Sequence, residues 1–346
     1  MNNSKNNKEI NYKPCPVAPV VSVIVPIYNS ALYLEKCLQS LFRQTLDSIE
    51  YIFIDDCSTD LSLDILKRTI RSFNDRSDCV RIIEHDLNKG VAVSRSEGVK
   101  MATGRWIIHC DSDDILEENA YEKLVSAGET YNADIVGCGF VVFGNEIKEY
   151  SAKEPVGVVD FKWAMSAIGG SDKNRLMGSL WNKLIKRELW EDVIIPEGLS
   201  YCEDIAVLFQ ILQKKPRIYY IGDKLYHYRI HPTSLISTKD DGMLKQCDVF
   251  IPFLESLKQI SDNESKVSIN ARIVDLLYRL LKSEVLSISE FSSRYKGYAS
   301  IIRDNKQHNC LELFHLRLSI NGIRPMANMI GTLNTIGYRC VKALLK

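Results

Sequence analysis

Two clusters of carboxylates follow directly after apolar segments of the chain. The pair Asp55–Asp56 comes after residues 51–54, and the run Asp111–Asp114 comes after residues 105–110. In an open α/β sheet, ligands bind beyond the carboxyl ends of the strands. Because closely spaced carboxylates repel one another, a divalent cation is their natural partner, and hard oxygen ligands suit Mg²⁺ or Mn²⁺. Together the clusters predict a metal and diphosphate site, whereas each alone is also compatible with an acidic helix N-terminus.

The sequence lacks the glycine-rich loops that cradle phosphates. The segment after the first apolar run reads PIYNSALYLEKC (26–37) and contains no GxGxxG, and no GxxxxGK[ST] occurs in the chain. Both motifs supply backbone N–H groups to phosphates. The charge of a bound phosphate must therefore be met by a metal and by side chains, which disfavours dehydrogenases and P-loop enzymes.

Strand and helix patterns alternate over the first 150 residues. Strands are expected at 20–28, 51–54, 80–83, 105–110 and 134–143, with helical patterns between them. Such alternation predicts βαβ units and a mostly parallel central sheet. Farther along, helices are expected at 181–190 and 203–215, a strand pair at 217–221 and 225–230, and helices from about residue 240 onward.

Composition excludes several classes of protein. The chain has 346 residues, 45% of them hydrophobic, which is enough for a sizeable core and roughly two domains. Its 44 basic residues balance 44 acidic ones, so no basic field would gather nucleic acid. No apolar run is long enough for a membrane-spanning helix. The polar first residues do not resemble a secretory signal, and residues 1–19 are predicted to be a flexible tail.

The cysteines are spaced singly along the chain. There are ten of them, and none forms a CxxC pair. A zinc site or a redox motif would need closer pairs. The expected state is therefore reduced thiols in a cytoplasmic protein.

Five segments resemble a known family, in the order in which that family has them. They are VSVIVPIYN (21–29), FIDDCSTD (53–60), NKGVAVSRSEG (88–98), HCDSDD (109–114) and LSYCED (199–204). The chain resembles glycosyltransferase family 2 over about residues 20–238. The resemblance implies an α/β, GT-A type nucleotide-diphospho-sugar transferase fold, as in inverting bacterial enzymes that build surface polysaccharides. Cys57 stands where the family usually has glycine, and Ser96 stands where it usually has asparagine.

The resemblance assigns a nucleotide-base pocket. Pro26, Tyr28 and Asp56 match the family residues that hold the base. Tyr28 can stack on the base, and Asp56 can accept the imide N–H of uracil, which would favour a UDP-linked donor. Arg95 would close this pocket or lie near the diphosphate. Without the resemblance, these residues could equally be a strand terminator, a core aromatic, a helix cap and a solvated arginine.

The same resemblance assigns the DxD element. Asp111 would meet the ribose, and Asp113 would bind the Mn²⁺ or Mg²⁺ that bridges the diphosphate. Asp114 would help or cap a helix. His227 and His231 follow a tyrosine-rich segment, and either could complete the metal shell, although a structural role is the simpler interpretation for each.

The remaining assignments concern the acceptor side. The WNKL segment (181–184) matches one common in the family. Trp181 could form an apolar floor under a sugar ring, and Lys183 could lie near the acceptor or the diphosphate; packing inward from a helix is the alternative for both. Asp204 is the predicted general base, and Glu203 would orient a neighbour or cap the helix.

Taken together, these features predict a metal-dependent inverting glycosyltransferase. It would move a sugar from a UDP-linked donor to a glycan or lipid-linked acceptor. A sugar-nucleotide nucleotidyltransferase and a non-catalytic carbohydrate-binding relative remain as alternatives. Residues 20–238 would form the catalytic domain and residues 239–346 a helical region. The last stretch, 317–346, has basic but no acidic residues, which predicts peripheral contact with an anionic membrane face.

Overall fold

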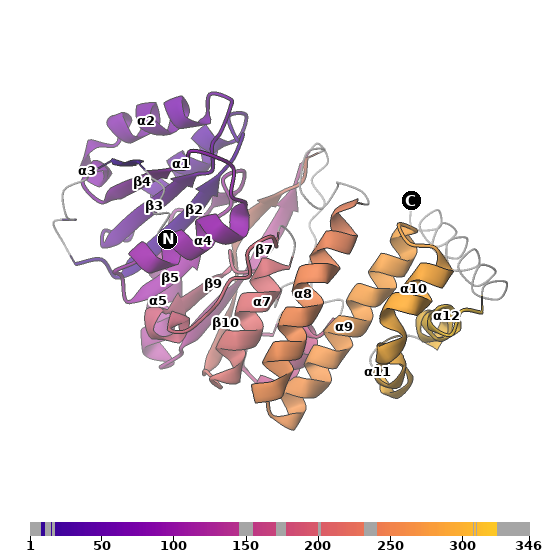
Figure 1. Ribbon diagram of the computed structural model, residues 1–346. Coiled ribbons are helices and arrows are strands. Elements are labelled where there is room, and N and C mark those ends of the chain that lie inside the picture. The colour runs from indigo at the N-terminus through magenta and orange to yellow at the C-terminus, as the bar shows by residue number, and fades with distance from the viewer. Residues whose placement is uncertain are drawn as a thin grey trace. The chain divides into compact units, whose positions relative to one another are not determined.

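The computed structural model describes residues 8–10, 15, 18–144, 155–170, 178–199, 202–231, 241–306, 308 and 310–323 (Figure 1). The chain forms two compact units. One comprises residues 1–164 and 174–235, and the other comprises residues 165–173 and 236–346. Within the described ranges, no helix combines the length and the apolar character that crossing a membrane would require.

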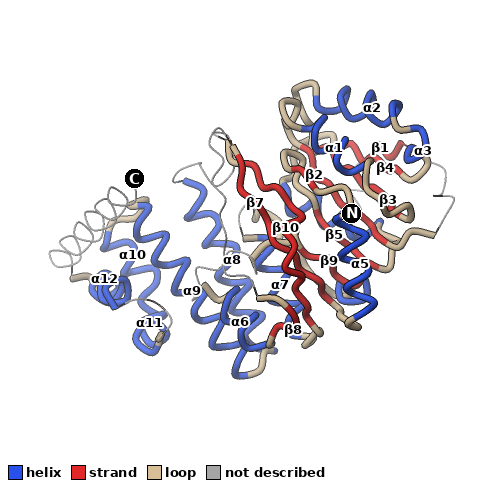
Figure 2. Tube along the Cα trace, turned by 180° about the vertical axis from the view of Figure 1, so that it is seen from behind, coloured by secondary structure: helices blue, strands red, loops and turns tan. Residues whose placement is uncertain are grey.

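A single mixed sheet organises the first unit, with the order β1-β4-β3-β2-β5-β9-β7-β10-β6 and β8 beside β10. The strands are β1 Lys8–Ile10, β2 Val21–Ile27, β3 Ile49–Asp55, β4 Val80–Glu84, β5 Trp106–His109, β6 Ile115–Leu116, β7 Ile135–Phe143, β8 Gly157–Val159, β9 Lys183–Lys186 and β10 Ile218–Arg229. Strands β4, β3, β2 and β5 run parallel, as do β7 and β10. Figure 2 shows β7 and β10 side by side along most of their length.

The central strands β2 and β3 are short runs in which Val, Ile and aromatic residues predominate. Every residue of β3 is buried, and β2 is buried except at Pro26. Burial on both faces explains why these strands have no alternation of polar and apolar residues. The carboxyl ends of β2, β3 and β5 therefore meet at one edge of the sheet, where Asp55–Asp56 and Asp111–Asp114 follow.

Helices fill the connections between these strands. They are α1 Leu34–Phe42, α2 Ser62–Ser72, α3 Asn74–Ser77, α4 Val91–Met101, α5 Ala120–Thr130, α6 Phe161–Ile168, the 3₁₀ helix η1 Arg187–Trp190 and α7 Glu203–Gln213. Helix α4 packs on β2 and β3. Gly98 allows this close approach, because a Cβ atom there would lie 2.4 Å from Cγ2 of Ile24. Helix α4 carries Arg95 and Glu97, so its packing on the sheet positions both side chains.

The second unit is helical, as the periodicity beyond residue 240 predicts. Its helices are α8 Asp241–Ile260, α9 Asn263–Ser283, α10 Ile288–Tyr295, the 3₁₀ helix η3 Lys296–Tyr298, α11 Ala299–Asp304 and α12 Cys310–Ile320. Local signals set the starts of two of these helices. Asp262 caps α9 by accepting from the N–H of Ser265, and Ser287 forms a capping box with Glu290 at α10.

Two secondary-structure predictions are wrong. Residues 181–190 are not a helix: they contain β9, which pairs antiparallel with β5 and β7, and then η1. The apolar spacing of this short segment fits either structure, and pairing in the sheet decides between them. Residues 217–221 and 225–230 do not form a strand pair either. They are one strand, β10, whose register shifts between Tyr220 and Tyr226 where a turn was expected.

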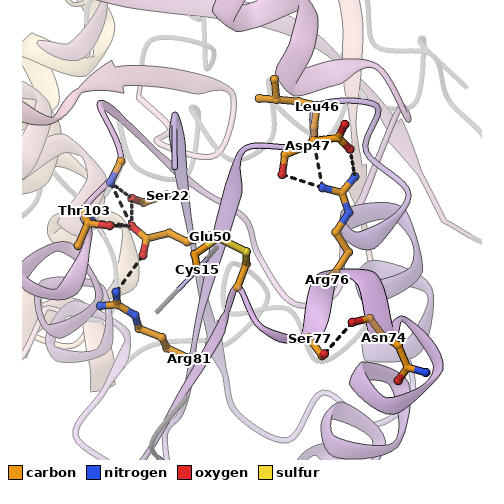
Figure 3. Close-up of a disulfide and its surroundings, with 12 residues drawn as sticks. Cys15, Ser22, Leu46, Asp47, Glu50, Asn74, Arg76, Ser77, Arg81 and Thr103 are labelled. Atoms are coloured by element: carbon orange, nitrogen blue, oxygen red, sulfur yellow. Dashed lines mark hydrogen bonds and ion pairs between the residues drawn. A yellow bond between two sulfur atoms is a disulfide. The ribbon is translucent and has the colours of Figure 1, made fainter. Parts of the chain in front are cut away.

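A disulfide between Cys15 and Cys79 corrects the prediction of reduced thiols (Figure 3). The Cα atoms of the two residues lie 4.5 Å apart across a sequence separation of 64. The prediction of a flexible tail over residues 1–19 is also wrong in part, because β1 pairs antiparallel with β4. Spacing along the chain could not reveal this cysteine pair, since the two residues meet only when the tail joins the edge of the sheet.

We expect the disulfide to stabilise the chain measurably. Closing a loop of this length restricts the unfolded chain and is worth about 4 kcal/mol. Cys15→Ser should therefore lower the free energy of unfolding by up to that amount, measured by denaturant titration without reductant. Cys310→Ser removes an exposed free thiol and serves as the matched control. If a reducing agent leaves the wild-type midpoint unchanged, the disulfide does not stabilise the fold.

The buried carboxylate of Glu50, near the disulfide, binds residues of β2, of β4 and of the segment before β5. Oε1 of Glu50 accepts hydrogen bonds from Oγ of Ser22 at 2.6 Å, from the N–H of Thr103 at 2.6 Å and from the N–H of Gly104 at 3.1 Å (Figure 3). Nη2 of Arg81 lies 3.4 Å from Oε2. A buried charge needs such partners, and this cluster holds the start of β5 in register with β2 and β3.

Candidate active site

The loop that contains the DxD element is fixed by strand β10. Asp114 is fully buried, and its carboxylate accepts from the hydroxyl of Tyr226 and from the N–H of Arg229, each at 2.6 Å. The same Tyr226 hydroxyl accepts from the N–H of Asp111 at 3.2 Å. Burial raises the pKa of Asp114 well above its usual range. Asp114 therefore holds the loop in place from below.

Asp113 points toward a histidine at the end of β10. Nε2 of His231 lies 2.7 Å from Oδ2 of Asp113. The other candidate histidine, His227, instead contacts Glu117, with Nε2 at 2.7 Å from Oε1. The structure thus brings together Asp113 and His231 and places His227 elsewhere.

The pair formed by Asp113 and His231 fits one side of a divalent-cation site. One carboxylate and one imidazole suit Mn²⁺, which commonly completes its shell with phosphate oxygens and water. Among the described residues, no three His, Cys, Asp or Glu side chains are grouped closely enough to hold a metal by themselves. The two side chains could therefore hold only part of the shell of a cation, and a bound ligand and water would have to supply the rest.

Arg95 connects the DxD loop to the start of helix α7. Its Nη2 lies 2.9 Å from Oδ1 of Asp111, its Nη1 lies 2.7 Å from Oδ1 of Asp204, and its Nε lies 3.7 Å from Oε1 of Glu203. Burial alone would lower the pKa of Arg95, but the carboxylates of Asp204, Asp111 and Glu203 outweigh it and raise that pKa. A cation held this firmly joins Asp111 to Glu203 and Asp204, which lie more than ninety positions farther along the sequence.

The two acidic residues that begin α7 differ in their surroundings. Both oxygens of Asp204 are hydrogen-bonded, Oδ1 to Arg95 and Oδ2 to the N–H of Leu180 at 3.0 Å. Glu203 has a longer contact with Arg95, and burial together with the charge of Asp204 raises its pKa to about 7. Burial likewise raises the pKa of Asp111 to about 6. The site therefore concentrates negative charge that a single arginine only partly balances.

The predicted base-pocket residues lie at the ends of β2 and β3. Tyr28 follows β2, and its side chain is 50% exposed, so its ring is available for stacking. Asp56 is buried beside it. Its Oδ1 accepts from Nδ1 of His85 at 2.7 Å and from the N–H of Lys89 at 2.8 Å, and its Oδ2 accepts from the N–H of Gly90 at 2.8 Å. Pro26 lies inside β2, opposite Ile54 of β3.

Trp181 and Lys183 are both buried. Trp181 stacks on the rings of Tyr226 and Tyr228, with centroids 4.3 and 5.6 Å away. Nζ of Lys183 donates to the carbonyl of Ser179 at 2.6 Å and to Oδ1 of Asn182 at 2.8 Å, and burial lowers its pKa to about 7. These contacts support β10 and the turn before β9, and a contact of either side chain with a ligand stays a prediction.

Sequence reasoning missed several residues that shape this site. Tyr226 and Arg229 anchor the DxD loop from a strand more than a hundred residues away. His85 contacts Asp56 from the end of β4. None of them stands in a motif, and each becomes recognisable only when the sheet brings its strand beside the acidic clusters.

Comparison with known proteins identifies similar sequences. A model of the family described as glycosyl transferase family 2 matches residues 22–193. EpsJ of Bacillus subtilis (strain 168), described as an uncharacterized glycosyltransferase, is 30% identical over 244 residues, which cover 68% of this chain and 70% of EpsJ. The minor teichoic acid biosynthesis protein GgaB of the same strain is 24% identical over 309 residues, covering 86% of this chain and 33% of GgaB.

Solved structures show the same fold. Residues 1–349 of S. aureus TarS, in complex with UDP-GlcNAc, align with a TM-score of 0.72 and 18% identity, covering 92% of each chain. The mannosyltransferase PcManGT from Pyrobaculum calidifontis, in complex with GDP-Man and Mn²⁺, aligns with a TM-score of 0.54 and 15% identity, covering 99% of this chain and 90% of that one. These likenesses confirm the predicted GT-A type α/β fold.

Proposed function

The chain belongs to glycosyltransferase family 2, and from this premise we propose that it transfers one sugar, with inversion, from a UDP-linked donor to a glycan or lipid-linked acceptor during synthesis of a cell-surface polysaccharide. The proposal is supported by its similarity to EpsJ and to the teichoic acid protein GgaB, and by the fold it shares with the UDP-GlcNAc complex of TarS.

One observation carries the proposal: Arg95 contacts both Asp111 and Asp204. Asp111 belongs to the proposed donor side and Asp204 to the proposed acceptor side. In an inverting transfer, the acceptor hydroxyl attacks the anomeric carbon from the face opposite the departing diphosphate. The group that takes the proton must therefore lie close to the donor but across the sugar from the phosphates, and Arg95 fixes these two carboxylates within such a distance.

Roles follow for the residues around this pair. Asp204 takes the proton of the acceptor hydroxyl, since a sugar hydroxyl is a poor nucleophile at neutral pH. Tyr28 stacks on the base, Asp56 accepts its imide N–H, and Asp111 meets the ribose. Asp113, with His231, would hold Mn²⁺ or Mg²⁺. When bound, such a cation supplies positive charge at the departing diphosphate.

The proposal is tested by incubating the chain with UDP-glucose, UDP-galactose and their N-acetyl forms. We expect slow release of UDP from one of them with Mn²⁺ or Mg²⁺, and loss of that release with EDTA. Release of pyrophosphate from a nucleoside triphosphate would identify a nucleotidyltransferase instead. Binding of sugars without any release of UDP would identify a non-catalytic relative.

We also propose peripheral association with an anionic membrane face through residues 317–346. Residues 324–346 of this stretch lie outside the described residues. Residues 317–320 form the end of α12, and residues 321–323 follow it. Deleting residues 317–346 should weaken sedimentation with phosphatidylglycerol vesicles and leave release of UDP from a soluble donor unchanged, because basic residues attract anionic lipid. Equal sedimentation of the full and shortened chains would contradict the proposal.

A further inference from the structure

Four charged side chains form a cluster at the proposed base pocket, and two of them, Asp56 and His85, are buried while Lys89 and Glu97 are half-buried. We call it the His85 cluster. Nδ1 of His85 lies 2.7 Å from Oδ1 of Asp56, and Nε2 lies 3.0 Å from Oε2 of Glu97. Nζ of Lys89 lies 3.2 Å from Oε1 of Glu97. The imidazole is completely buried, so it links the end of β3 to helix α4 inside the protein.

The geometry defines the charge of the imidazole. Each ring nitrogen faces a carboxylate, and an ionised carboxylate can only accept a hydrogen bond. Both nitrogens must therefore carry a proton. Burial would raise the pKa values of Asp56 and Glu97, but their hydrogen bonds, that of His85 first, outweigh burial and lower both. For His85 burial acts in the lowering direction, yet the bonds to Asp56 and Glu97 raise its pKa overall.

Other charged groups near the ring do not change this assignment. Asp55 is the last residue of β3 and precedes Asp56, Glu84 is the last residue of β4 and precedes His85, and Lys89 lies before α4. The two additional carboxylates favour the cation, and the ammonium of Lys89 opposes it. Because Lys89 shares Glu97 with the ring, its charge is partly balanced within the cluster.

The cluster leaves Asp56 with one acceptor position. Oδ1 accepts hydrogen bonds from His85 and from the N–H of Lys89. Within the described part of the chain, Oδ2 accepts one hydrogen bond, from the N–H of Gly90. A carboxylate oxygen can accept about two hydrogen bonds. The remaining lone pair of Oδ2 is therefore directed by the groups that fix Oδ1, and foremost by His85.

We propose that His85 is a positioning residue for the nucleotide base: as a cation it anchors Asp56 to Glu97, and so aims Oδ2 of Asp56 at an imide N–H of the kind found in uracil. This inference rests on the proposed function, because it takes the base pocket as given. It implies that donor binding weakens at alkaline pH. The carboxylates at both ring nitrogens hold the imidazole in its charged form, and that charge is lost as pH rises through a pKa that lies above its ordinary value.

The test combines UDP binding with the protonation state of the ring. His85→Gln should weaken UDP binding about tenfold, measured by calorimetry with Mn²⁺ present, since a hydrogen bond to a charged group is worth at least about 1.4 kcal/mol. The donor KM should rise similarly, with kcat nearly unchanged. Between pH 6 and pH 9 the ratio of the wild-type affinity to the His85→Gln affinity should fall, because groups that titrate in both proteins, such as Asp111 and Glu203, cancel in this ratio. Nitrogen NMR of the wild type should show a histidine with both ring nitrogens protonated at pH 7, absent from the variant.

Two further variants make the result decisive. Glu97→Gln removes one of the two carboxylates and should weaken UDP binding in the same direction but less. His227→Gln breaks a histidine–carboxylate contact outside the pocket, in which Nε2 of His227 lies 2.7 Å from Oε1 of Glu117. This variant should leave UDP binding unchanged. A folded His85→Gln with wild-type UDP affinity, or a ratio of the two affinities that does not vary with pH, would overturn the inference. A wild-type chain that binds GDP, CDP or ADP but not UDP would instead overturn the proposed donor, and the assignment to uracil with it.

Discussion

Replacing Asp204 with Asn is expected to reduce sugar transfer by roughly 10²-fold or more, the usual scale for the loss of a general base. Asn has the shape of Asp but cannot take a proton from the acceptor hydroxyl. Its amide can still accept one of the two hydrogen bonds that Asp204 now receives from Arg95 and Leu180. UDP and metal binding should therefore persist, and the loss should appear in kcat measured as product formed from donor and acceptor.

Glu203→Gln is the matched control, because Glu203 is the neighbouring carboxylate of the same helical turn. Its pKa, raised to about 7 by burial, is suited to a general base at neutral pH, which makes it the competing candidate. Near wild-type transfer by Asp204→Asn together with an inactive Glu203→Gln would move the role to Glu203. A rate that rises through pH 7 in the wild type and not in Glu203→Gln would lead to the same conclusion.

Arg95→Ala is expected to abolish transfer and to destabilise the catalytic unit by about 3 to 5 kcal/mol, as for other buried ion pairs that lose one partner. The three carboxylates around Arg95 would remain buried without their cation. The destabilisation should depend on pH. Burial raises the pKa values of Asp111 and Glu203 to about 6 and about 7, so the folded state favours their protonated forms. Protonation of Asp111 and Glu203 therefore stabilises the folded state at low pH, and this contribution is lost as pH rises through their pKa values.

Chemical unfolding at pH 5 and pH 8 measures this effect. Arg95→Ala should be closer to the wild type at pH 5 than at pH 8. Arg105→Ala is the control, because Arg105 forms an exposed ion pair with Glu129, and such pairs contribute about 1 kcal/mol or less. Arg95→Lys keeps the charge but has one nitrogen in place of three, and it should rescue stability in part without restoring transfer. Equal stability of Arg95→Ala and the wild type at pH 8 would contradict the role of this residue.

The sequence predicts strands β2, β3 and β5 well, but neither β9 nor the continuity of β10, although both lie inside the sheet. Strands β2, β3 and β5 are β-branched runs buried on both faces, so their pattern has one interpretation. Residues 181–190 and β10 were misassigned because their structure depends on partners. Strand β9 forms because β5 and β7 each have an edge with which it can pair. Strand β10 continues through Gly222 because its residues pair with β7 both before and after that glycine.

The candidate site divides in the same way. Asp113, Asp204 and Arg95 stand in motifs with ordered spacing, so the sequence alone singles them out as candidates. The contact between Asp113 and His231 and the one between Asp56 and His85 could not be assigned, because each joins residues whose proximity is created by the sheet. Burial is equally invisible in the sequence: Nζ of Lys183 is buried and donates to Ser179 and Asn182, and its contact with a ligand stays a prediction.

The short strand β1 has a practical consequence for anyone who shortens the chain. It covers β4, whose backbone groups would otherwise form the open margin of the sheet, and Cys15 fastens the segment that follows it to Cys79. Uncovered margins of this kind are templates on which other polypeptides can add a strand. Residues 1–19 look dispensable in a sequence, but deleting them would expose the unpaired edge of β4. The shortened protein would then be prone to aggregate, for a reason unrelated to its catalytic residues.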